Sequence, residues 1–453
     1  MPSGPLTHRH LLVVVVVLAV ATVAGLVALW PPLTDDSEPL EPLVTGELVA
    51  VEVVPGEPDE FLGLSGDTAL LEVAVLDGPD AGTTLELEVT TDGFPELRVG
   101  DRVLMDRLTD VDGELRYFIT DLDRLPALLW LVGLFVVVVL AVSRWHGLRS
   151  LLGLALSLAI VVRFVVPAII AGTSPPLVAM VGAMAVMLVT LYLVHGVNEM
   201  TTSAIIGTAG ALVLTIGLGS LFIDRGRITG FASDDAVFAR FAVDGLDLQG
   251  LVLAGLIIAA LGVLDDVTIS QASTVFALHD TDRTQTWPAL FGRAMQVGRD
   301  HIASVVNTLF LAYTGASIAL LLLFTTGGVP TRELLNSELL AEEIVKTVVG
   351  SLGLIAAVPL TTALAATIAI SRGPDAPPLR RAHQHGPAVP PVSAAATNAA
   401  AAPGSEPAAP RRPTAAEDDA ARDQRAAEAW QRYLERHDRA RRDADEGGGP
   451  DPR

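Results

Sequence analysis

Long runs of apolar residues dominate the hydrophobic pattern of this chain. Each run carries at most two charged residues, and a segment of about 20 apolar residues is long enough to cross ~30 Å of hydrocarbon. Helices in soluble cores seldom stay apolar on every side for this length. The pattern therefore predicts a polytopic α-helical membrane protein with about eight transmembrane helices. The predicted spans are Leu11–Trp30, Ala127–Val142, Leu151–Gly172, Pro176–Val194, Ser203–Ile223, Leu251–Ser273, Ile302–Thr325 and Ile344–Ile370.

A different, strand-like pattern separates the first apolar run from the second. Residues 84–89 alternate apolar and polar side chains, and short segments rich in Val, Leu and Thr are divided by turn residues such as Asp112-Gly113. The predicted strands are Leu43–Val54, Ala69–Asp77, Thr83–Thr90, Leu97–Met105 and Glu114–Thr120. We expect a small all-β domain, with an OB-like barrel as the suggested topology.

Most of the negative charge belongs to this β domain. Residues 31–126 contain 24 acidic residues and five arginines, a charge of −19 within the chain's total of −22. Such a surface repels nucleic acid, which we exclude as a partner. Two explanations stay open, namely attraction of cations and an ordinary solvated surface.

Arginines near the ends of the apolar runs predict the orientation. More of them lie on the connections that would be cytoplasmic if the N-terminus were inside, as Arg144, Arg149 and Arg372 do. We therefore expect both termini in the cytoplasm of a bacterium and the β domain outside its plasma membrane. The expected domains are a cytoplasmic stub and membrane anchor at 1–30, the β domain at 31–126, a seven-helix bundle at 127–371 and a low-complexity cytoplasmic tail at 372–453. Cleavage of the first run as a signal peptide is the alternative to a retained anchor.

Common catalytic and cofactor motifs are missing from the sequence. The chain has no cysteine, no HExxH motif and no Gly-rich phosphate loop, which excludes thiol catalysis and cysteine-based zinc sites. We expect neither a cofactor nor a metal, and we do not expect an enzyme. An intramembrane enzyme is the most remote alternative, because it would need carboxylates that face each other, such as Glu199 opposite Asp265.

Two adjacent carboxylates, Asp265 and Asp266, interrupt the sixth predicted span. A charge at the centre of a span costs ~2.5–3.5 kcal/mol and marks a functional site or a buried partner. Neighbours on a helix point about 100° apart, so both could face one site only if the helix broke near Gly262. The alternative ends the helix at Leu264, with both carboxylates among the lipid headgroups. We select Asp265 and Asp266 as candidates for ion or proton coupling.

Further polar residues accompany this pair. Glu199 is the third coupling candidate, and its spacing of four from His195 would place both on one helical face, although two ligands do not make a metal site. Arg163 lies well inside the third span, four residues before Pro167, which weakens the local hydrogen-bond ladder. The supporting polar candidates are Arg163, Asn307, Arg299 and Asp300.

Four stretches, which contain the candidate carboxylates as well as Arg299 and Asn307, carry a resemblance to a known family. They are Gly196–Thr208 (GVNEMTTSAIIGT), Gly262–Leu278 (GVLDDVTISQASTVFAL), Gly298–Gly315 (GRDHIASVVNTLFLAYTG) and Glu343–Thr362 (EIVKTVVGSLGLIAAVPLTT). The sequence resembles the YibE/F-like family of bacterial multi-pass membrane proteins from about Leu11 to Ile370. The resemblance implies an anchor, an outer β domain and a helical bundle, in that order. It implies no particular activity.

Together these features favour a permease-like protein for ion- or proton-coupled transport of an unknown substrate. The alternative is a non-transporting scaffold or sensor whose outer β domain binds a partner. A scaffold tolerates the loss of charge inside the membrane, whereas a coupled transporter does not. The expected partners are the lipid bilayer and an unidentified ion or small molecule, and a homo-oligomer is one expected assembly.

Overall fold

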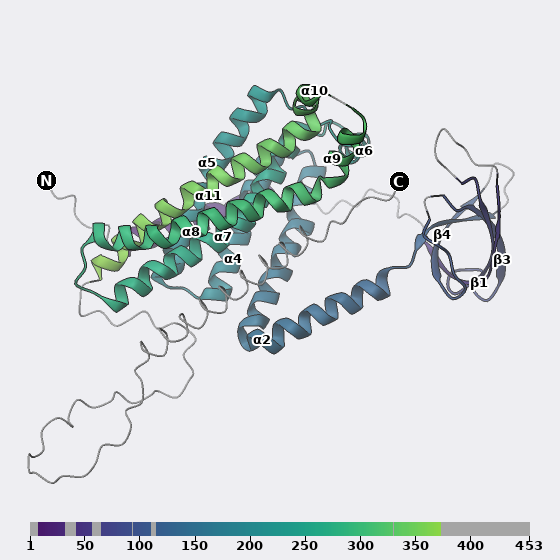
Figure 1. Ribbon diagram of the computed structural model, residues 1–453. Helices are drawn as coiled ribbons and strands as arrows, with labels where there is room; N and C mark the ends of the chain where they lie inside the picture. The colour runs from purple at the N-terminus through teal and green to yellow at the C-terminus, as the bar shows by residue number, and fades with distance from the viewer. Residues whose placement is uncertain are drawn as a thin grey trace, which may run out of the picture. The chain divides into compact units, whose positions relative to one another are not determined.

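A computed structural model describes residues 8–31, 42–56, 65–92, 94–109, 115–328 and 330–372 of the chain (Figure 1). The predicted low-complexity tail falls, after Arg372, outside the described residues.

Five antiparallel strands form one sheet in the order β3-β2-β1-β4-β5. They are β1 (Val44–Val54), β2 (Thr68–Val75), β3 (Thr84–Thr90), β4 (Arg102–Thr109) and β5 (Leu115–Leu122). Alternate side chains of β2 are buried against β1 and β4, in a core that includes Leu48, Leu71, Val73 and Met105. The edge strands β3 and β5 also contact each other. The all-β domain is confirmed, and its OB-like topology stays a prediction.

The fourth strand begins later than the sequence pattern predicts. The expected segment Leu97–Met105 is wrong at its start, because residues 98–101 form a turn. Gly100 has a left-handed backbone with φ +93°, and the Arg98 amide donates to the Asp101 carboxylate at 2.9 Å. Such a turn favours glycine and ends regular extension, so β4 starts at Arg102.

The helices follow the apolar runs but extend beyond most of them. The long ones are α1 (His8–Ala28), α2 (Leu125–Ile160), α4 (Pro175–His195), α5 (Glu199–Gly226), α7 (Leu248–Thr281), α8 (Trp287–Ala316) and α11 (Glu338–Ser371). The short ones are a π-helix η1 (Val161–Val165), α3 (Val166–Ile170), α6 (Asp234–Ala242), α9 (Ile318–Thr326) and α10 (Thr331–Asn336). Among the described residues, five helices are long and apolar enough to cross a membrane, or six if α8 and α9 form one bent span.

Two predicted runs, the third and the seventh, contain breaks that the pattern does not show. The second and third runs lie on α2, η1 and α3. The backbone leaves the helical region at Arg144, with φ 50° and ψ −123°, within the connection predicted between these two runs, whereas η1 interrupts the third run itself. The seventh run is divided at Ser317, where α8 and α9 differ in direction by 61°. The π-helical turn before Pro167 has a local cause, because proline has no N–H and its ring displaces the carbonyl four residues earlier.

Helices α5, α7 and α11 pack closely side by side in the centre of the bundle, as Figure 1 shows for the region around their labels. Small residues allow this approach, as is common in membrane interiors. A Cβ atom at Gly207 of α5 would overlap the Thr361 hydroxyl of α11. The Thr208 and Thr268 hydroxyls lie 2.7 Å apart and link α5 to α7. Gln271 of α7 donates to the Thr362 hydroxyl at 2.8 Å, so polar contacts join all three helices.

The Gly207 contact predicts the effect of one added methyl group. Gly207→Ala should lower the stability of the bundle by about 1–3 kcal/mol, because overpacking displaces α11. Gly217→Ala on the same helix is the matched control, since a Cβ there meets no atom within 4 Å and alanine favours helix. Thermal unfolding of both variants in detergent measures the difference. Equal melting temperatures for the two variants would contradict the packing.

The hydrogen bonds of Asp92 predict that the stability of the β domain depends on pH. The Asp92 carboxylate accepts hydrogen bonds from the Ser65 and Gly66 amides, each at 3.0 Å. These hydrogen bonds hold the pKa of Asp92 below its ordinary value, and the bond from the Ser65 amide contributes most to this lowering. A lowered folded pKa gives stability that is present above the unfolded pKa and is lost as pH falls through the folded value.

Acidification should therefore speed amide exchange of residues 65–75 beyond the intrinsic change in exchange rate. Asp92→Asn should remove most of this acid effect, because the side chain no longer titrates. Hydrogen-exchange mass spectrometry on the full-length protein provides the measurement. An identical acid response in the variant and the wild type would show that Asp92 is not responsible.

Candidate functional site

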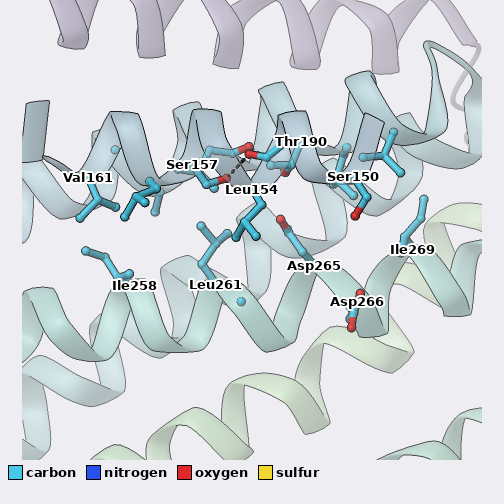
Figure 2. Close-up of a pocket in the computed structure, with 18 of the residues that line it drawn as sticks. Ser150, Leu154, Ser157, Val161, Thr190, Ile258, Leu261, Asp265, Asp266 and Ile269 are labelled. Atoms are coloured by element: carbon cyan, nitrogen blue, oxygen red, sulfur yellow. Dashed lines mark hydrogen bonds between the residues drawn. The ribbon is translucent and has the colours of Figure 1, made fainter. Parts of the chain in front are cut away.

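A cavity of about 500 Å³ lies between the second half of α2, η1, α4 and α7. Its walls are mostly aliphatic, and its polar lining residues are Ser150, Ser157, Thr190, His195, Asp265 and Asp266. Figure 2 shows Asp265 directed from α7 toward Thr190 and Ser150 on the facing helices. The size lies within the range of small-molecule sites. The cavity is therefore the leading candidate for a functional site.

Helix α7 runs without interruption from Leu248 to Thr281. Both local alternatives raised by the sequence are therefore wrong, since α7 neither breaks near Gly262 nor ends at Leu264. The lining residues Ile258, Leu261, Asp265 and Ile269 recur at helical spacing. Asp266, about 100° further around the helix, is exposed at the edge of the cavity and turned away from its interior (Figure 2).

The Asp265 carboxylate is under-satisfied. Its Oδ1 atom is shielded from solvent and has no hydrogen-bond partner among the described residues. The Thr190 hydroxyl interacts with this carboxylate, but it also donates a hydrogen bond to the Val186 carbonyl oxygen at 2.8 Å. A hydroxyl has one hydrogen to donate, so Thr190 serves one acceptor at a time. No arginine or lysine is among the residues that line the cavity. Asp265 therefore holds a solvent-shielded carboxylate oxygen and has no ion pair within the part of the chain that the structure describes, which is an expensive arrangement.

Glu199 does not belong to this cavity. The sequence places His195 and Glu199 on one helical face, and this prediction is wrong because α4 ends at His195 and α5 begins at Glu199. Gly196 has φ +76° between them, and Asn198 caps α5 by accepting from the Thr201 amide at 2.9 Å. His195 lines the cavity, whereas Glu199 pairs with Arg372 at 3.0 Å.

The supporting residues named from the sequence also lie apart from Asp265. Arg163, Arg299, Asp300 and Asn307 are exposed, and none of them lines the cavity. The ring of Phe164, next to Arg163, lies 5.8 Å from the ring of Trp30 near the end of α1. Among the described residues, no ion pair joins Asp265 to Arg163, the supporting candidate that the sequence placed inside the third span.

The structure also shows polar residues that the sequence reasoning missed. Ser150, Ser157 and Thr190 line the cavity, yet a single hydroxyl on an apolar helix gives no distinctive signal. The Lys346 ammonium lies 2.6 Å from Glu342 and 3.1 Å from Glu343, in a largely buried cluster. Here a signal existed, because Lys346 is the only lysine in the chain.

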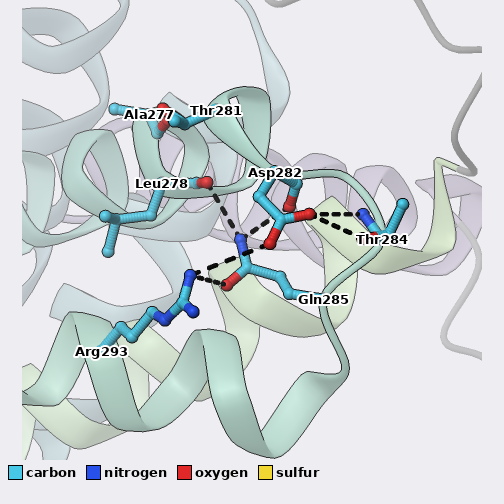
Figure 3. Close-up of polar contacts among 7 residues, drawn as sticks. All are labelled: Ala277, Leu278, Thr281, Asp282, Thr284, Gln285 and Arg293. Atoms are coloured by element: carbon cyan, nitrogen blue, oxygen red, sulfur yellow. Dashed lines mark hydrogen bonds and ion pairs between the residues drawn. The ribbon is translucent and has the colours of Figure 1, made fainter.

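The turn after α7 is held by a local polar network (Figure 3). The Gln285 amide nitrogen donates to the main-chain oxygens of Leu278 and Asp282, at 3.0 and 2.8 Å. The Asp282 carboxylate accepts from the Thr284 hydroxyl at 2.7 Å. Hydrogen bonds from the side chain and then the backbone of Thr284 hold the pKa of Asp282 below its ordinary value. This network defines the turn from which α8 leaves α7.

A family model described as YibE/F-like protein matches residues 131–371, which is more than half of the chain. The chain belongs to the YibE/F-like family. The matched segment contains every residue that lines the Asp265 cavity, as well as Glu199 and Lys346. No curated protein and no solved structure matches the chain. The family and the apolar helices together identify a membrane protein. They assign no activity to the YibE/F-like bundle.

The Glu199–Arg372 contact predicts coupling between the start of α5 and the end of α11. Glu199→Gln or Arg372→Gln alone should destabilise the protein by about 1–3 kcal/mol, because each leaves a mostly buried charge without its ionic partner. The double variant should lose less than the sum of the two single losses. Thermal unfolding of the four proteins completes the cycle. Strictly additive losses would show that the pair does not contribute to stability.

Proposed function

We propose that this YibE/F-like protein is an ion- or proton-coupled permease in which Asp265 is the coupling carboxylate. The observation that carries the proposal is the Oδ1 atom of Asp265, which is buried, without a hydrogen-bond partner among the described residues, and on the wall of a cavity. A shielded carboxylate of this kind is stabilised when a proton or a cation binds to it and is destabilised when the ion leaves. Coupled transport requires such a difference in free energy between the occupied and the empty site.

The contrast among the three acidic candidates supports this choice. Glu199 already has Arg372 at 3.0 Å, so its charge is balanced within the protein. Asp266 is exposed and carries no comparable desolvation cost. Asp265 Oδ1 and Glu199 Oε2 are both shielded from solvent without a hydrogen-bond partner among the described residues, but only Glu199 has an ion pair there, with Arg372. We therefore assign the coupling role to Asp265, with Asp266 at the edge of the cavity as an auxiliary charge.

An arrangement of eight spans supports the permease proposal, and helix lengths favour that number. Helices α2, η1 and α3 together cover 46 residues, which would extend about 69 Å at 1.5 Å per residue. This length is more than twice the ~30 Å of the hydrocarbon core, and the backbone bends out of the helical region at Arg144. Two spans here, one for α8 with α9, one for α1 and the remaining four long helices give the proposed eight.

The proposed orientation has both termini in the cytoplasm of a bacterium and the β domain outside the plasma membrane. The excess of arginines on connections such as 143–150 supports it. An even number of spans, counted with α1, places both termini of the chain on the same side. The acidic β domain would then face the medium from which cations enter.

Transport by full-length protein in liposomes tests the proposal. Inward gradients of protons, sodium or potassium are applied, and internal ion-sensitive dyes record the flux. Wild-type protein should carry at least one of these cations faster than empty liposomes. Asp265→Asn should reduce that flux roughly tenfold or more. Its melting temperature should stay unchanged or rise, because an unpaired buried charge is removed.

Asp235→Asn, on the exposed surface of α6, is the matched control and should keep the wild-type flux. A flux that survives Asp265→Asn would overturn the coupling role. Wild-type protein that carries none of the three cations would favour the alternative, a membrane scaffold or sensor whose β domain binds a partner.

A further inference from the structure

The Asp265 cavity combines a negative group with an apolar wall. The aliphatic lining includes Leu154, Leu158, Val161, Ile258, Leu261 and Ile269. The polar groups are few and include two carboxylates, and no arginine or lysine lines the cavity. An anion would therefore meet the two carboxylates without an arginine or lysine to pair with, which disfavours it. The lining favours a solute that is positive and largely apolar.

The size and ligand set of the cavity disfavour a bare inorganic ion as its only occupant. Calcium requires about six to eight oxygen ligands and magnesium about six. The described residues contain no group of three or more His, Asp or Glu side chains arranged to hold a metal ion. A volume of about 500 Å³ is instead typical of sites for small organic molecules.

We infer that the cavity binds a hydrophobic monovalent organic cation, whose charge pairs with Asp265 and whose apolar groups contact the aliphatic walls. The inference rests on the proposed function, because it names the class of solute that the permease would carry. A cation that pairs with Asp265 satisfies the carboxylate oxygen for which the described residues provide no hydrogen-bond partner. Burial of its apolar surface against the aliphatic walls adds to the affinity.

Two probes of matched shape and opposite charge test the charge requirement. Tetraphenylphosphonium is a hydrophobic cation, and tetraphenylborate is an anion of nearly the same size. Calorimetric titration of full-length protein in neutral detergent, with protein-free micelles subtracted, gives both affinities. The phosphonium should bind roughly tenfold or more tightly than the borate. Equal affinities, or no phosphonium binding, would overturn the inference.

Two substitutions locate the bound cation. Asp265→Asn should weaken phosphonium binding by roughly tenfold or more, because the carboxylate charge is lost. Gly262→Leu should weaken it while Asp265 remains, because the new side chain enters open space on the cavity wall. Gly255→Leu is the matched control, two turns earlier on α7, with open space at its Cβ and no place in the cavity lining.

Folding of each variant is checked by its melting temperature, and Gly262→Leu keeps the test decisive if Asp265→Asn does not fold. Phosphonium binding that survives Gly262→Leu would place the cation elsewhere and overturn the inference. A failure of the proposed function would give a different result from a failure of this inference. Ion flux without phosphonium binding would leave a coupled permease for another solute, whereas phosphonium binding without any flux would leave a binding protein that does not transport.

Discussion

The absence of water from the hydrocarbon core is the constraint on which this structure depends. Backbone groups there must be paired within helices, and polar side chains need partners inside the protein. In the central helices α5, α7 and α11, threonine hydroxyls and Gln271 meet this demand through contacts between helices. Glycine at position 207 allows the close approach that these contacts require. The polar groups of the bundle centre are thereby largely used for packing.

Asp265 differs because it lies on another face of α7. Thr268 and Gln271 point toward the packed helices, whereas Asp265 points into the space between α7, α4 and the second half of α2. Small residues on the facing wall, such as Gly153, Gly182 and Ala183, leave room there. The same helix therefore supplies a rigid, close-packed face and a cavity face with an unsatisfied carboxylate. This combination places a charge on a rigid element, as a binding site requires.

The sequence pattern predicted most of the fold, because apolar runs and strand alternation are local signals. It missed features that depend on backbone conformation or on distant residues. The π-helix η1 and the turn at Gly100 interrupt regular structure locally. The early start of α8, at Trp287, has no continuous apolar run. The partner of Glu199 is Arg372, far along the chain, so only the folded structure shows that this candidate is paired. The sequence indicated Asp265 because a carboxylate inside a membrane span costs free energy. The cavity beside it could not be predicted, because its other walls come from α2, η1 and α4.

The central claim is that Asp265 is an unpaired carboxyl group in an apolar cavity. Dicyclohexylcarbodiimide, a hydrophobic carbodiimide, tests it most directly because it modifies protonated carboxyl groups in apolar surroundings. Native full-length protein in detergent would be labelled, digested and mapped by mass spectrometry. The account predicts an adduct on Asp265, with much less on the exposed Asp266 and on Glu199 paired with Arg372. Labelling of Asp266 or Glu199 with none at Asp265 would contradict the account.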